Sequence, residues 1–535
     1  MPKDDNKGVI RIESILGGHA PTTHFAGADQ FRASLGIDPS QPISDSIGPL
    51  TTTSCGLLRP TSASDLSAGT VIHNPPMFME SNPKDGNIFV YDAGGSVYTV
   101  DVNFTAVTGL GDLNDEQTAS GNGLAYYDNY IYFACNTTVA RYGPLNGSPA
   151  FTDNYWVSTL GKTRLSDNTS YPTDSGSGSV KYPNHVLHRH SDGKLYIADI
   201  VDNKGTIHYI ATTKTTVEGD TDNGSSYNKI QVGYGLWPTC MESYGSDLVI
   251  AFYEGSGAGV SQTRAKVAFW DTISTNVNKI TWVEFPDPYI SAIKNIDGVL
   301  YVASGRVRSD GFRVSRFIGG YTFEEVAFFG TGAMPFPDAM DGASSQLIFG
   351  TFTDTPTTAG CLFSKGLSKA SLGDGIFNIH RVSSSESSAI VTSLYLQDNW
   401  NIAFLAPTVG WATGDNGTSH NGIDYKSGYG NSENLWWSQV YRIGQRFKIT
   451  KVTIPLATFI SSSRSLVPTI YFDNGNTSQS LATINNTNYP SKDHIVQRPE
   501  NFVGNHDFFL ELKWTGTANM TVCLPITIEY ELLDD

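Results

Sequence analysis

The sequence predicts an all-β protein whose largest part is a β-propeller. Two observations predict this class. The 535 residues include 53 glycines and 12% aromatic residues, while helix-favouring runs rich in Leu, Ala, Glu and Lys are nearly absent. A turn followed by a short apolar strand also recurs about seven times, at intervals of roughly 45 to 65 residues. A period of this length built from hairpins is typical of propeller blades.

Each repeat is a polar turn that enters a strand ending near Ala or Gly. The copies are Asp85–Tyr91, Asp128–Ala134, Asp192–Ala198, Gly245–Ala251, Asp297–Ala303 and Ser344–Gly350, with a degenerate seventh beginning at Asp398–Trp400. We expect a strand before each copy, as at Tyr289–Ile293, and another after it, as at Phe312–Ile318. We therefore predict about seven blades, or six if the last copy belongs to the next domain.

The repeats divide the chain into three parts. Residues 1–60 lack a regular period and are rich in proline between 37 and 49, which predicts an extended N-terminal arm. This arm is either a disordered tail or a segment that orders against a neighbouring subunit. Residues 61–430 form the predicted β-propeller. Residues 431–535 contain strands such as 448–455 and 508–514, which predict a C-terminal antiparallel β-sandwich-like domain.

Composition limits the partners and the compartment. The net charge of −17, from 35 basic and 52 acidic residues, argues against a surface that grips nucleic acid stably or sequence-specifically. The five cysteines (55, 135, 240, 361 and 523) show no C-x-x-C pair, so we expect small buried apolar groups. No secretory signal or membrane span is evident, which predicts synthesis and folding in cytoplasm without disulfides.

Two clusters resemble metal or acid–base sites. His188 and His190 would share one face of a strand, a geometry suited to a metal or a general base, but no carboxylate stands at a matching spacing. The stretch Glu218–Gly224 resembles a calcium loop, yet its glutamate does not arrive where an EF-hand needs it. We interpret the first cluster as structural and the second as a solvated turn.

Other searches for chemistry give no assignment. The glycine-serine stretches 175–179 and 255–259 are predicted loops rather than nucleophile elbows. Paired carboxylates for glycoside cleavage would be recognised only from their separation in space. Trp400, Trp411 and the pair Trp436–Trp437 are candidates for a sugar-stacking platform, and for the pair we favour interdomain packing. No catalytic, cofactor-binding or metal-binding residue is therefore assigned, and no cofactor is expected.

Several stretches resemble a known group of proteins. These are 14–18, 37–39, 141–145, 215–224, 314–316 and 484–490. They are similar to virion proteins of uncultured marine tailed phages. The order of arm, propeller and terminal β-domain also resembles β-propeller tail proteins of tailed bacteriophages, especially the nozzle or hub below the portal.

The resemblance implies a non-enzymatic virion structural protein. It implies a tail nozzle or hub that forms a homo-oligomeric ring for DNA passage and tail assembly, made in the host cytoplasm and located in the virion tail. Expected partners are other tail proteins, namely a portal or adaptor and a fibre. Alternatives are a head-decoration protein, or a host-facing propeller that binds or cleaves a surface glycan as a receptor-binding protein or depolymerase.

Overall fold

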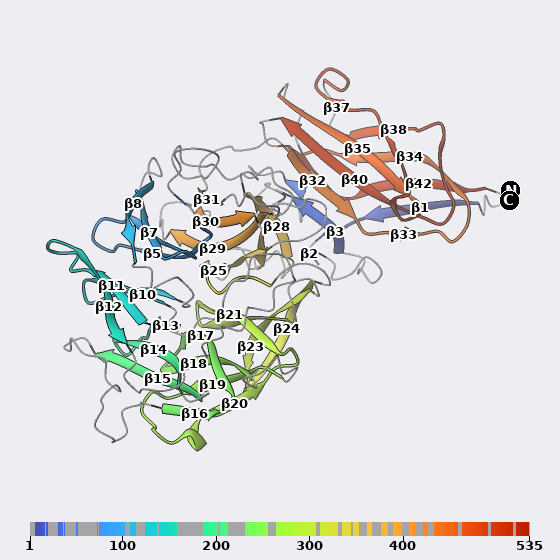
Figure 1. Ribbon diagram of the computed structural model, residues 1–535. Coiled ribbons are helices and arrows are strands. Elements are labelled where there is room, and N and C mark those ends of the chain that lie inside the picture. Colours follow the sequence, from blue (N-terminus) through green and yellow to red (C-terminus); the bar gives the residue numbers. More distant parts are fainter. Residues whose placement is uncertain are drawn as a thin grey trace.

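The computed structural model shows an all-β chain in two lobes (Figure 1). The structure describes residues 6–15, 18–19, 30–35, 37, 50–51, 72, 74–101, 107–113, 123–135, 138–157, 186–201, 204–211, 230–254, 264–305, 311–329, 334–343, 346–351, 361–365, 376–382, 389–397, 406–413, 421–425, 433–457, 463–490, 494–516 and 520–533. In these ranges there is no helix with the length and apolar character needed to cross a membrane.

The described strands of the larger lobe form a β-propeller with seven blades, each an antiparallel sheet of consecutive strands. Blades 1 to 3 are β5 (Pro76–Ser81), β6 (Ile88–Asp92), β7 (Ser96–Val100) and β8 (Val107–Asp112); β9 (Leu124–Tyr127), β10 (Tyr130–Ala134), β11 (Thr138–Gly143) and β12 (Ala150–Val157); and β13 (Val186–Arg189), β14 (Lys194–Val201), β15 (Lys204–Ala211) and β16 (Ile230–Tyr234). Blades 4 and 5 are β17 (Leu236–Tyr244), β18 (Asp247–Glu254), β19 (Lys266–Trp270) and β20 (Thr281–Glu284), with the 3-10 turn η2 (Val277–Lys279) before β20; and β21 (Tyr289–Ile296), β22 (Val299–Gly305), β23 (Phe312–Gly319) and β24 (Thr322–Phe329). Blades 6 and 7 are β25 (Met340–Ala343), β26 (Gln346–Thr351), β27 (Cys361–Lys365) and β28 (Ile376–Arg381); and β29 (Ala389–Gln397), β30 (Ala406–Thr413) and β31 (Asn421–Tyr425).

The predicted repeats are the second strands of blades 1 to 6, namely β6, β10, β14, β18, β22 and β26. The turns before them need left-handed backbone, which explains their residue types. Gly193 and Gly298 have φ of 79° and 84°, and blade 2 uses Asn129 at 64°. The strands bury both faces between neighbouring blades, so each sequence is continuously apolar. The seventh copy, at Asp398–Trp400, lies outside the described residues.

Side chains of blade 7 close the ring on blade 1. The Thr392 and Ser393 hydroxyls on β29 both donate to the Pro76 carbonyl at the start of β5, at 2.6 and 2.8 Å. The segment before β25 reaches the same place, because the Met79 amide donates to Asp338 Oδ2 at 2.8 Å. Blades 6, 7 and 1 therefore meet around a few buried polar contacts, and the ring is closed (Figure 1).

Hydrogen bonds between successive turns tie blades 1 to 4 together. Lys84 Nζ of blade 1 donates to the Leu145 carbonyl of blade 2, and Tyr127 OH of blade 2 donates to the Gly193 carbonyl of blade 3. Ser191 Oγ of blade 3 then donates to blade 4, at the Gly245 carbonyl. These contacts hold the blades in register at the end where the inner strands turn outward.

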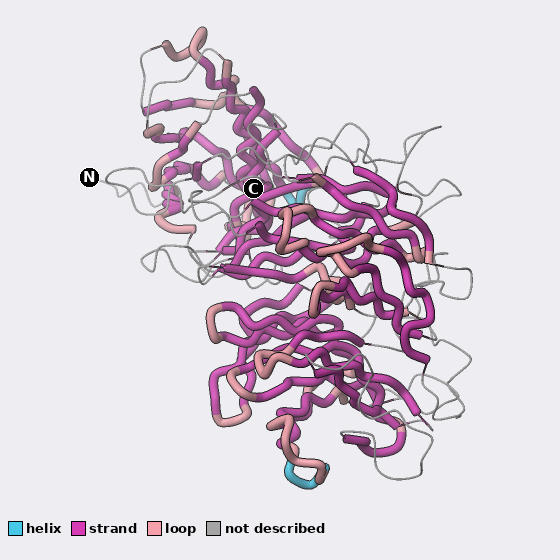
Figure 2. The backbone as a smooth tube through the Cα atoms, turned by 90° about the vertical axis from the view of Figure 1, so that its left-hand side faces the viewer, coloured by secondary structure: helices cyan, strands magenta, loops and turns pink. Residues whose placement is uncertain are grey.

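The second lobe is a sandwich of two sheets (Figure 2). One sheet contains β1 (Lys7–Ile12), β42 (Ile526–Leu532), β34 (Phe447–Pro455), β38 (His494–Gln497) and β39 (Phe502–Gly504). The other contains β2 (Gly18–His19), β3 (Gln30–Leu35), β32 (Glu433–Ser438), β33 (Tyr441–Arg442), β40 (Asp507–Gly516), β35 (Arg464–Phe472), β36 (Thr477–Ser480) and β37 (Ile484–Asn485). The short pair β4 (Leu50–Thr51) and β41 (Thr521–Val522) and the 3-10 turn η3 (Asp473–Gly475) complete it.

The N-terminal segment differs from the prediction. Within residues 1–60, expected to be an extended arm, β1 pairs antiparallel with β42 and β3 pairs with β32 of the same chain. The alternation that ends in buried Ile12 suits a half-buried edge strand, and Phe31 is fully buried in the sandwich core. The described part of this segment is thus a component of the C-terminal sandwich. Strand β3 also lies beside β28 of blade 6 and so joins the two lobes.

Candidate functional site

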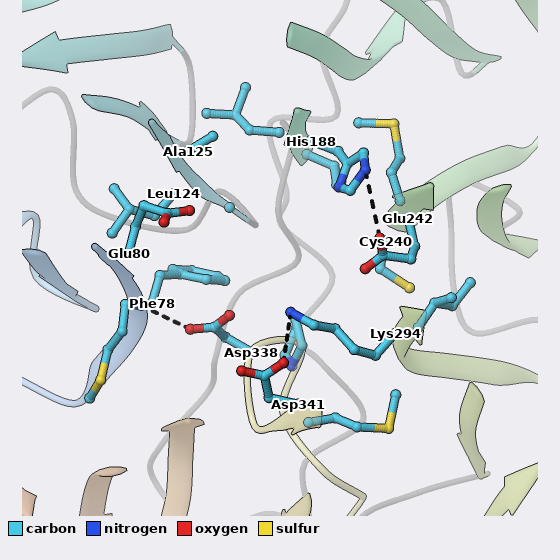
Figure 3. A pocket seen from close by; sticks show the side chains of 18 of the residues that line it. Phe78, Glu80, Leu124, Ala125, His188, Cys240, Glu242, Lys294, Asp338 and Asp341 are labelled. Carbon is cyan, nitrogen blue, oxygen red and sulfur yellow. Dashed lines mark hydrogen bonds and ion pairs between the residues drawn. The ribbon is translucent and has the colours of Figure 1, made fainter. Parts of the chain in front are cut away.

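A cavity of about 310 Å³ lies on the propeller axis, inside the first strands of all seven blades (Figure 3). It is lined by Phe78, Met79, Glu80, Gly123, Leu124, Ala125, Val186, Leu187, His188, Arg189, Cys240, Met241, Glu242, Ile293, Lys294, Pro337, Asp338, Met340, Asp341, Leu394 and Tyr395. The volume is at the lower end of the range for small-molecule sites, about 300–1,000 Å³. Charged groups gather in it, which is unusual for the interior of an apolar β-protein.

One ion pair crosses from blade 5 to blade 6. Lys294 Nζ on β21 lies 3.3 Å from Asp341 Oδ1 on β25, and the Leu396 amide donates to the other oxygen of Asp341. The Asp341 carboxylate raises the pKa of Lys294 above its ordinary value, although burial acts in the opposite direction. Lys294 is therefore a fixed cation and not a candidate amine nucleophile.

Three carboxyl groups around Lys294 resist ionisation. Burial raises the pKa of Glu80 to about 7, with the Ser81 amide as an opposing hydrogen-bond donor. Burial likewise raises the pKa of Glu242 to about 7. It raises the pKa of Asp338 well above the ordinary range, despite the nearby Lys294 charge. Such shifts mark this cavity as the principal candidate site in the described part of the chain.

The two histidines singled out in the sequence meet at one serine of the next blade. His188 Nε2 is 2.8 Å and His190 Nδ1 2.9 Å from Ser243 Oγ, while His190 Nε2 is 3.3 Å from the Ser246 carbonyl. Because a carbonyl only accepts, His190 carries its proton on Nε2 and receives the Ser243 hydroxyl proton at Nδ1. Ser243 then accepts from His188 Nε2.

The carboxylate missing from the sequence pattern comes from a neighbouring blade. Glu242 Oε1 lies 3.8 Å from His188 Nε2, and it accepts the Ser243 amide at 2.8 Å. Burial lowers the pKa of His188 to about 3, so this ring stays neutral at physiological pH. The histidine cluster thus joins blades 3 and 4 by hydrogen bonds at the cavity wall. No group of three or more His, Cys, Asp or Glu side chains in the described ranges is arranged to hold a metal ion.

The other sequence candidates lie elsewhere. Trp411 and Trp436 are fully buried, in blade 7 and in the sandwich core. The interpretation of Trp436 as interdomain packing is wrong, because its ring packs against Phe31 within the sandwich. Trp437 donates to Glu511 and has the Arg32 guanidinium over its ring. Cys135 and Cys240 are buried as expected, and Cys523 is half-buried.

Several candidates fall outside the described residues. They are Trp400, the acidic loop 218–224, the stretches 175–179 and 255–259, and Cys55.

Sequence reasoning missed Glu80, Glu242, Lys294, Asp338 and Asp341 as a group. A signal was present, because four of them stand three to five residues before a predicted repeat turn. The first strand of a blade is otherwise apolar there, so a charge at that place indicates a side chain facing the axis.

No family model matches the chain, and no curated protein matches it. Among solved structures it is similar to the Pan2 WD40 domain of Neurospora crassa, with 10% identity and a TM-score of 0.41 over 72% of this chain and 99% of that chain. It is also similar to Raptor of Chaetomium thermophilum, with 9% identity and a TM-score of 0.40 over 66% of this chain and 28% of that one. A third is the Dos1 propeller, with 11% identity and a TM-score of 0.36 over 68% and 81% of the respective chains.

The raised pKa of Glu80 leads to a testable pH dependence. Between its ordinary value of 4.5 and about 7 the folded chain binds more protons than the unfolded chain, so Glu80 lowers stability as pH rises through this window. His188 acts oppositely, since its lowered pKa reduces stability as pH falls below 6.5. We expect Glu80→Gln to raise the melting temperature by about 2–4 °C at pH 8 and by much less at pH 5.

Differential scanning fluorimetry of the full chain at both pH values measures this difference. Glu284→Gln, at the exposed last residue of β20, is the matched control and should leave the pH profile unchanged. An equal shift of the Glu80→Gln variant at pH 5 and pH 8 would contradict the expectation.

Proposed function

We propose that this chain is a non-enzymatic structural protein of a tailed-phage virion, a nozzle or hub component that assembles with copies of itself. The virion setting is supported by the stretches that resemble phage virion proteins. Fold alone does not distinguish functions, because propellers serve many. The assembly role is supported by one structural observation, the placement of exposed apolar side chains on the propeller.

Large apolar side chains are exposed at the turns of two successive blades. Ile273 follows β19 of blade 4, and Ile318 and Tyr321 flank the β23–β24 turn of blade 5; they are 78%, 57% and 51% exposed. These turns lie at the same end of the propeller, where the Phe269 ring of blade 4 contacts the Tyr321 ring of blade 5, and this apolar surface is here called the blade edge. Side chains of this kind are normally covered in an assembly. A second copy of the chain is the proposed occupant.

In such an assembly the DNA passage would run between copies rather than through a propeller. The propeller axis is occupied by the side chains around Lys294 and by the segment that carries Asp338 (Figure 3). The net charge of −17 would keep a shared passage from binding DNA phosphates.

The blade edge supplies the test. We expect the purified chain to form a ring-sized oligomer by light scattering coupled to gel filtration. Combining Ile273→Ser with Ile318→Ser should shift it to monomer by weakening self-association at least tenfold. Val496→Ser, an exposed apolar position on the sandwich, is the control and should leave the oligomer intact. Immunogold labelling of phage particles should place the chain on the tail.

A chain that stays monomeric at high concentration and is absent from purified particles would refute the proposal. An oligomer that the double variant leaves intact would refute the role of the blade edge.

One observation favours a second candidate, a propeller that cleaves host glycan. Converging carboxyl groups with raised pKa values, Glu80 and Glu242, are what a glycosidase would bring to one site. The same cavity holds Lys294 bound to Asp341, which leaves fewer free carboxyl groups for acid–base work. The test is whether the chain releases reducing ends from host polysaccharide. Release by the unaltered chain, and its loss in Glu80→Gln and in Glu242→Gln, would support this candidate over the structural one.

A further inference from the structure

The axial cavity carries an excess of negative charge. Its acidic lining residues are Glu80, Glu242, Asp338 and Asp341, and its basic ones are Lys294 and Arg189. The four carboxyl groups exceed the two basic groups by two, and burial raises the pKa of Glu80, Glu242 and Asp338, so a bound cation would favour their ionised forms. His188 adds no charge, because its lowered pKa of about 3 keeps it neutral. A ligand that neutralises the cavity would therefore carry two positive charges.

Two of the carboxyl groups have an oxygen free for such a ligand. Glu80 uses Oε1 to accept the Ser81 amide, and Asp338 uses Oδ2 to accept the Met79 amide. Among the described residues, the remaining oxygen of each has neither a hydrogen-bond donor nor a cation within ion-pair distance. Burying carboxylates without a counter-ion is costly, so a bound cation would stabilise both.

The free oxygens lie at separate places on the wall. In Figure 3 the Phe78 ring stands between the carboxyl groups of Glu80 and Asp338. Leu124 and Leu394 add apolar surface to the same cavity. Two acidic points joined by an apolar wall suit a chain with an ammonium group at each end and methylenes between them. They suit a single metal ion poorly, in keeping with the lack of a three-ligand group in the described ranges.

We propose that the axial cavity binds a small aliphatic diamine dication, with one ammonium on Glu80 and the other on Asp338. The methylenes lie along Phe78 and Leu124. Lys294 forms an ion pair with Asp341, so the Asp341 carboxylate does not compete for the ligand. The site therefore offers two carboxylates to two ammonium groups. This activity is independent of the proposed virion role, since it involves no residue of the blade edge.

The test is calorimetric titration of the full chain with 1,4-diaminobutane at pH 8 and low salt. We expect one site per chain, with at least tenfold weaker binding of butylamine, which has one charge. Glu80→Gln and Asp338→Asn should each weaken diamine binding at least tenfold. Both variants retain an amide oxygen for the backbone donors of Ser81 and Met79, which favours folding. Glu284→Gln, outside the cavity, should bind as the unaltered chain does.

Two further measurements keep the proposal open to refutation. Lowering the pH to 5 should abolish binding by the unaltered chain, because Glu80 and Asp338 are then protonated while the ligand remains charged. This measurement does not depend on the folding of any variant. Magnesium chloride at equal concentration should neither bind at one site nor displace the diamine. Competition by magnesium, equal binding by butylamine, or unchanged binding by both cavity variants would each overturn the proposal.

Discussion

Replacing Lys294 by methionine is expected to lower the free energy of unfolding of the propeller by about 2–4 kcal/mol. The change removes the partner of Asp341 and the positive charge that favours the ionised forms of Glu242 and Asp338. The estimate lies below the usual cost for a fully buried pair because the Lys294 side chain keeps 35% exposure. Urea titration, with calorimetry as a second experiment, measures the loss of unfolding free energy.

A double variant separates charge from packing. Adding Asp341→Asn to Lys294→Met removes both charges and still leaves an oxygen to accept the Leu396 amide. Replacing both members of an ion pair by neutral groups is often close to neutral, so we expect more than half of the stability to return. A loss below about 0.5 kcal/mol in the single variant would place this pair with ordinary surface pairs and contradict the expectation.

Deleting residues 1–37 is expected to unfold the sandwich while the propeller remains folded. The deletion removes β1 from β42 and takes Ile12, Ile15, Phe31 and Ile37 out of the sandwich core. Burial of each such side chain contributes about 1.5–3 kcal/mol, which is a large share of the stability of a domain this size. Calorimetry should then show one transition fewer than in the full chain.

The control supplies the missing segment as a separate peptide. A peptide of residues 1–37 added to the shortened chain should restore the lost transition, whereas deletion of residues 1–5 alone should leave it unchanged. If the shortened chain keeps both transitions, the N-terminal strands are dispensable to the sandwich. In that case they would be available to pair with a neighbouring subunit.

Much of the propeller could be predicted from local chemistry. The turn at Asp192–Gly193 and the turn at Asp297–Gly298 demand left-handed backbone, and the apolar runs after them suit strands buried on both faces. These requirements involve residues that are close in the chain, so a single sequence reveals them. The same reasoning predicted the sandwich strands 448–455 and 508–514.

The pairing partner of the N-terminal segment could not be predicted in this way. Residues 7–12 show the alternation of an edge strand, but their partner β42 stands at the other end of the chain. Any half-buried edge would satisfy such a strand equally well, on this chain or on a neighbouring one.

The sequence by itself determined the repeated hairpins, their turn residues and the all-β class, because these depend on backbone preferences at the turns and on the short apolar runs that follow them. Only the tertiary structure decided which charges share a site. Glu80, Glu242 and Asp341 are more than 90 residues apart in sequence from one to the next, and each belongs to a different blade. They meet because closing seven blades into a ring brings every first strand to one axis.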